Sequence, residues 1–74
     1  MSLLDAQLLD AHAAADRVRL VTLYTQAADA CRDDEAAGFY LTHAYVYALE
    51  AAAPQAEMLR ARLVAMGRET PLSG

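Results

Sequence analysis

Apolar residues recur along the chain at the spacing of an α-helix. In the segment 17–31 they fall every three or four positions, at Leu20, Leu23, Tyr24, Ala27 and Cys31. In the segment 54–67 the same spacing links Ala56, Leu59, Leu63 and Met66. A stripe of this kind covers one face of an amphipathic helix that packs on a core. Because good helix formers fill the intervening positions, the pattern predicts an all-α protein.

Capping residues and helix breakers mark where these helices begin and end. Asp16 can cap a helix that follows the Ala13–Ala15 run, and the acids from Asp33 to Glu35 suit the positive end of a helix dipole. Pro54 is tolerated only in a first helical turn, and Gly67 is typical of the position just past a last turn. We therefore expect a small bundle of four short antiparallel helices, arranged as two helical hairpins. The expected ranges are about 3–14, 17–31, 34–52 and 54–67.

The segment 34–52 has a different pattern from the others. Small and apolar residues form a dense stripe along it, at Ala37, Leu41, Ala44, Ala48 and Ala52. Phe39 and Val46 lie roughly on the other side. A helix that is apolar on nearly all sides is typically a buried one, so we expect this helix at the centre of the bundle. Its only stripe with polar capacity consists of Tyr40, His43, Tyr47 and Glu50.

Two stretches of the chain look alike. The run Ala13-Ala14-Ala15-Asp16 is matched later by Ala51-Ala52-Ala53-Pro54, and a new amphipathic helix follows each. Between them, Leu23-Tyr24-x-x-Ala27-Ala28 precedes a series with Ala37, Leu41, Tyr45 and Ala48. Over residues 17–54 this pattern resembles tetratricopeptide repeats and, more closely, Sel1-like repeats. Thr42 stands where the family has a glycine. The resemblance implies binding of a protein or peptide through helix surfaces, and its motif positions are packing positions.

Length and charge narrow the class of protein. The 74 residues allow one domain, which we expect over 1–70 with a flexible tail at 71–74. Ten acidic residues against six arginines give a net charge of −4, which disfavours binding to nucleic acid or to anionic membranes. No apolar run is long enough to span a membrane, and the N-terminus lacks the cationic region of a secretory signal. We therefore expect a cytoplasmic protein.

The reactive side chains do not form a catalytic pattern. Cys31 lies at the C-terminal end of a predicted helix, where the helix dipole opposes a thiolate. Neither His12 nor His43 has a histidine or glutamate at the helical spacing that metal sites use. We therefore expect no enzyme activity, no metal site and no cofactor.

The predicted function rests on the helix over 34–52. We expect a non-enzymatic protein–protein interaction module, either an adaptor or a small regulator. Its predicted interaction surface is formed by Phe39, Tyr40, His43, Val46, Tyr47 and Glu50. The simpler interpretation of the polar stripe is a half-buried rim that needs no partner. An alternative function is a small-molecule or metal-binding bundle, with a ligand held between Tyr40, His43 and Tyr47. Because an alanine-rich core of this size barely offsets the entropy of folding, we expect self-association as a homodimer.

Overall fold

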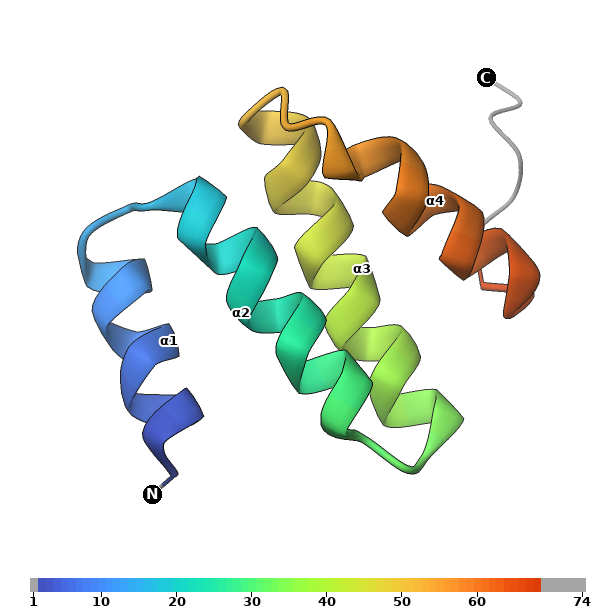
Figure 1. Cartoon of the computed structure of the whole chain (residues 1–74), viewed down its shortest axis with the longest axis horizontal. Helices are drawn as coiled ribbons and strands as arrows, with labels where there is room; N and C mark the ends of the chain where they lie inside the picture. Colours follow the sequence, from blue (N-terminus) through green and yellow to red (C-terminus); the bar gives the residue numbers. More distant parts are fainter. Residues whose placement is uncertain (1, 69–74) are drawn as a thin grey trace.

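A computed structural model describes residues 2–68 of the chain as four helices (Figure 1). These are α1 (Leu3–Ala13), α2 (Arg17–Ala30), α3 (Asp34–Glu50) and α4 (Gln55–Ala65). Consecutive helices run in roughly opposite directions. The all-α bundle is therefore confirmed, and each expected helix end lies within two residues of the observed one. The expected tail at 71–74 lies outside the described residues.

Side chains cap the N-terminal ends of the first three helices. Ser2 and Asp5 form a reciprocal capping box at the start of α1. The Asp16 carboxylate accepts a hydrogen bond from the Arg19 amide at the start of α2. Asp33 accepts bonds from the amides of the first turn of α3. These bonds pair amides that have no partner within the helix, and they fix where each helix begins.

Three helices end through the same backbone turn. The residue after the cap is left-handed in each, with φ of 53° at Ala15, 52° at Ala52 and 73° at Gly67. In α1, the amide of Ala15 donates to the His12 carbonyl and the amide of Asp16 donates to the Ala11 carbonyl. This pair of bonds is the Schellman motif, which usually has glycine at the left-handed position. Both alanine runs therefore end their helices with an alanine in the left-handed conformation, which is unfavourable in free energy for any residue with a Cβ atom.

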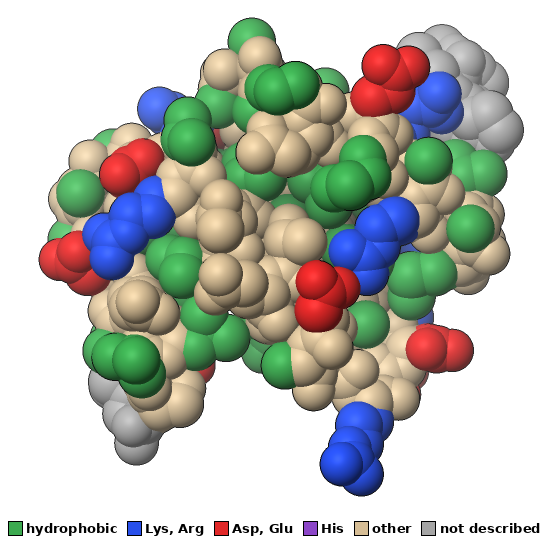
Figure 2. Space-filling view, in the orientation of Figure 1, with side chains coloured by type: hydrophobic (Ala, Val, Ile, Leu, Met, Phe, Trp, Pro, Cys, Tyr) green, Lys and Arg blue, Asp and Glu red, His purple; other side chains and the backbone are tan. Residues whose placement is uncertain are grey.

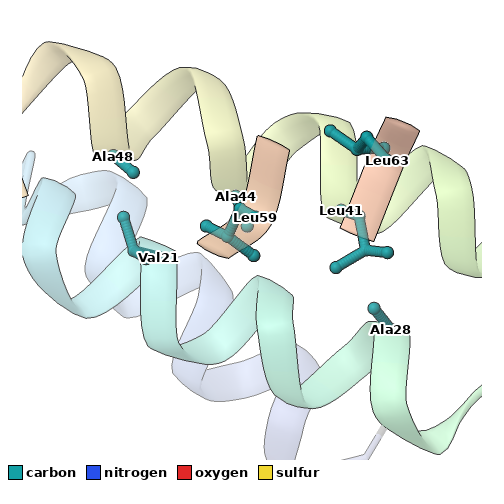
Figure 3. Close-up of a cluster of buried hydrophobic side chains, with 7 residues drawn as sticks. All are labelled: Val21, Ala28, Leu41, Ala44, Ala48, Leu59 and Leu63. Atoms are coloured by element: carbon teal, nitrogen blue, oxygen red, sulfur yellow. The ribbon is translucent and has the colours of Figure 1, made fainter. Parts of the chain in front are cut away.

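The core is built mainly on the packing of α2 against α3. Figure 3 shows side chains of α2, α3 and α4 meeting in one buried cluster, formed by Val21, Ala28, Leu41, Ala44, Ala48, Leu59 and Leu63. Small alanines at the contact let the helix backbones approach closely. A second cluster, formed by Ala11, Leu20 and Leu23, holds α1 against α2. Tyr24 and Tyr47 pack against both clusters and connect them.

One side of α3 is open to solvent, and this corrects the prediction of a helix buried on nearly all sides. The helix is central in that it packs against both α2 and α4. Its side chains Phe39, Val46 and Leu49 are nevertheless 57%, 44% and 55% exposed. The molecule measures only 15 Å in its shortest dimension, against 35 and 28 Å in the other two. A bundle this thin leaves each helix with one side in solvent.

Ion pairs between helices lie at the surface. Arg19 of α2 contacts Asp10 of α1, and Arg62 of α4 contacts Asp29 of α2, each at 2.8 Å. On the face drawn in Figure 2, arginine and acidic side chains lie beside one another among hydrophobic ones. Exposed pairs of this kind stabilise a fold by about 1 kcal/mol at most, so the apolar core carries the fold.

Candidate interaction surface

The exposed side of α3 presents an apolar stripe without charge. We define the α3 outer face as Phe39, Thr42, Val46 and Leu49, all of them exposed. They follow one another at intervals of three, four and three residues, which places them on one side of the helix. From Ala36 to Leu49 the sequence contains no Asp, Glu, Lys or Arg. An exposed, uncharged apolar stripe is typical of a surface that another molecule covers.

Polar atoms on this side of α3 are bonded back to the helix itself. The Thr42 hydroxyl donates to the carbonyl oxygen of Gly38 at 2.8 Å. The Nδ1 atom of His43 lies 2.9 Å from the carbonyl oxygen of Phe39. Because a carbonyl only accepts, Nδ1 carries the proton in this contact. Both donors are thus satisfied without water, which lowers the cost of covering this side of the helix.

Beside the outer face lies a shallow hollow of about 340 Å³. It is lined by Thr42, His43, Val46, Tyr47 and Glu50. Four of these residues stand at positions i, i+3, i+4 and i+7 of α3. In coiled coils, four residues at this spacing form the hole that receives a side chain of a facing helix. The Glu50 carboxylate at the edge of the hollow is bonded to Nε of Arg17 at 2.8 Å.

An aromatic cluster borders the hollow on the side of α2. We define it as Tyr24 with His12, Tyr40, His43 and Tyr47, which surround the Tyr24 ring. The Tyr47 and His43 rings stack on Tyr24, with centroid distances of 5.9 and 5.2 Å. His12 of α1 lies edge-on to Tyr24 and brings its Nε2 atom 2.8 Å from the Tyr24 hydroxyl. Burial raises the pKa of Tyr24, and the Tyr47 and Tyr40 hydroxyls add to this shift.

The structure divides the predicted interaction surface into two parts. Phe39, Val46 and Glu50 are exposed on the solvent side of α3. Tyr40 and Tyr47 are half-buried and pack against Tyr24. His43 joins the two parts, because its ring also lies 4.4 Å from that of Phe39.

Sequence reasoning missed several members of this region. Thr42 and Leu49 were detectable from the three–four–three spacing that starts at Phe39. His12 and Tyr24 were not, since nothing in the local pattern indicates that their helices turn these side chains toward one another.

The other candidate side chains are more dispersed. Cys31 is a free, half-buried thiol at the C-terminal cap of α2. Among residues 2–68, no three His, Cys, Asp or Glu side chains are grouped as metal ligands. Within the same range, no helix has the length and apolar character needed to cross a bilayer.

Comparison of the chain with known protein families, with curated proteins and with solved structures found no match. The resemblance to tetratricopeptide and Sel1-like repeats therefore stays a prediction from the sequence.

Proposed function

We propose that the chain is a non-enzymatic interaction module, an adaptor or small regulator, that binds a protein through the α3 outer face and the adjoining hollow. The observation that carries this proposal is the exposed apolar stripe of α3, which lies in a stretch without charged residues (Ala36 to Leu49) and whose polar donors are bonded back to the helix. A protein partner would remove Phe39, Val46 and Leu49 from water without leaving those donors unpaired. We also propose that the module works in the cytoplasm, since a free thiol suits a reducing compartment.

Phe39 is the expected anchor of such a contact. It is the largest exposed apolar side chain of α3, and its ring is held against those of His43 and Tyr40. Interfaces gain most of their affinity from a few large side chains that fill pockets of the partner. An aromatic ring already held by its neighbours loses less conformational entropy on binding than a free one.

The proposal is tested by photo-crosslinking in the native cell. A photoreactive amino acid is placed at Val46 and, as a matched control, at Val18, an equally apolar residue of α2 that is 59% exposed. We expect a discrete protein adduct from position 46 only, and we expect it to disappear when Phe39→Glu is added. Equal adducts from both positions, or none from position 46, would contradict the proposal.

A further inference from the structure

We infer that the protein seated on the α3 outer face is a second copy of this chain, with the two α3 helices packed antiparallel. The inference rests on the proposed function and names its partner. Two features of the same helix support this pairing. Phe39 is exposed to solvent. Four residues further along the chain begins a hole, which is formed by His43, Val46, Tyr47 and Glu50. The helix thus carries both an exposed knob and a hole of the kind that receives a knob.

A single twofold axis between the two copies can place each knob in the hole of the other copy. When the axis passes between Thr42 and His43, antiparallel pairing places Phe39 of each copy opposite Val46 of the other. The Phe39 ring then enters the hollow of the second copy, and the second copy's ring enters the first. Reciprocal contacts of this kind are what a twofold interface requires, and they leave no knob or hole unmatched.

Charge along α3 agrees with this pairing. Each chain carries a net charge of −4, so two copies repel wherever their acidic surfaces meet. The stretch from Ala36 to Leu49 has no acidic residue, and it forms the middle of the paired helices, with Glu35 and Glu50 at the two ends. At the ends of the pair, Glu50 approaches Glu35 of the second copy. Arg17, which is already bonded to Glu50, supplies the cation at that point.

The size of the contact between the two α3 helices sets the affinity that we expect for the dimer. A helix of 17 residues is about 25 Å long. A pair of such helices forms an interface at the small end of the specific range, so we expect a dissociation constant of about 10–100 µM.

Sedimentation equilibrium of the full chain tests the association. Phe39→Glu should raise the dissociation constant at least about tenfold, the effect of losing a central aromatic anchor. Leu9→Glu, on α1, is the control, because Leu9 is 59% exposed and Phe39 is 57% exposed. It should leave the constant unchanged. A wild-type chain that stays monomeric up to about 500 µM, or equal effects of the two variants, would overturn the inference.

A disulfide test checks the register. In a Cys31→Ala background, Thr42→Cys places a thiol beside the twofold axis, where the two copies come within the roughly 7 Å between Cα atoms that a disulfide allows. Mild oxidation should link this variant into a dimer, whereas Thr22→Cys, at an exposed threonine of α2, should stay monomeric. Equal linkage of both variants, or linkage of neither, would contradict this register.

The two proposals fail in different ways. A crosslinked adduct from position 46 that contains only a different protein overturns self-docking and leaves the interaction module in place. The absence of any adduct specific to position 46 overturns both.

Discussion

The Nε2 atom of His12, near the end of α1, lies 2.8 Å from the phenolic oxygen of Tyr24 in the middle of α2. The same imidazole lies edge-on to Tyr47 of α3, with ring centroids 5.8 Å apart. Through His12, α1 therefore reaches a helix with which its backbone makes no close approach. The position of α1 against the hairpin of α2 and α3 depends in part on this one side chain.

Removing the imidazole should loosen α1. We expect His12→Ala to lower the free energy of unfolding by about 1 kcal/mol, the usual net value of one hydrogen bond. A double-mutant cycle with Tyr24→Phe, measured by urea unfolding, should give a coupling energy of about 0.5–1 kcal/mol. The exposed Gln26 of α2, substituted by Ala, is the control and should show no coupling to Tyr24. A coupling of zero between His12 and Tyr24 would mean that their contact does not hold α1.

Stability at alkaline pH should depend on Tyr24. Burial raises the pKa of Tyr24 above 10.0, so the folded protein keeps this phenol neutral at a pH where the unfolded chain ionises it. The folded state then binds more protons than the unfolded state, and the free energy of unfolding falls as pH rises above about 10. We expect Tyr24→Phe to show a shallower fall than the wild type in urea unfolding at several pH values. Tyr45→Phe, which removes a phenol outside the aromatic cluster, is the comparison, and an equal slope in both variants would contradict the prediction.

Ala15 and Ala52 adopt a left-handed backbone conformation that lowers the stability of the fold. Ala15→Gly and Ala52→Gly should each stabilise the fold by about 1 kcal/mol, because glycine adopts positive φ without the clash that alanine meets. For a domain of this size, the midpoint of thermal unfolding should rise by about 4–8 °C per substitution. Ala14→Gly is the matched control. It lies in the same alanine run, but its φ is −85°, so glycine there should be neutral or destabilising. A destabilising Ala15→Gly would show that the turn at the end of α1 does not limit stability.

These turns show what sequence patterns can and cannot predict. Asp16 and the acids that begin at Asp33 indicate helix starts, because a cap acts on amides only two or three residues away. Gly67 reveals a helix end because glycine favours the left-handed conformation. Ala15 and Ala52 adopt the same conformation without any intrinsic preference for it, so only their neighbours Asp16 and Pro54 indicate the breaks.

The candidate surface was partly predictable for a related reason. Periodicity within α3 correctly separates Leu41 and Ala48, which are buried, from Phe39 and Val46. It does not reveal how many helices surround α3, and the expectation of burial on nearly all sides was wrong for that reason. The contact between His12 and Tyr24 depends on how α1 is rotated against α2, which no local pattern encodes.

The stability of the fold should depend strongly on the size of the buried side chains of α3. Leu41 is fully buried between α2 and α4, so Leu41→Ala should destabilise the protein by about 2–5 kcal/mol through lost burial and a new cavity. Leu49→Ala is the same substitution on the same helix at a side chain that is 55% exposed. Urea unfolding of the monomeric Phe39→Glu background should show a change of about 0.5 kcal/mol or less for Leu49→Ala. Similar losses from both substitutions would contradict the assignment of the core side of α3.

The central claim is that the α3 outer face is a contact surface and that a second copy of the chain covers it. It is tested most directly by amide NMR spectra of the isotope-labelled wild-type chain, recorded over a dilution series from about 500 to 10 µM, a range that spans the expected dissociation constant. We predict concentration-dependent shifts for Phe39, Thr42, His43 and Val46, and constant signals for Leu9 of α1. Shifts confined to other helices, or spectra that do not change with concentration, would contradict the claim.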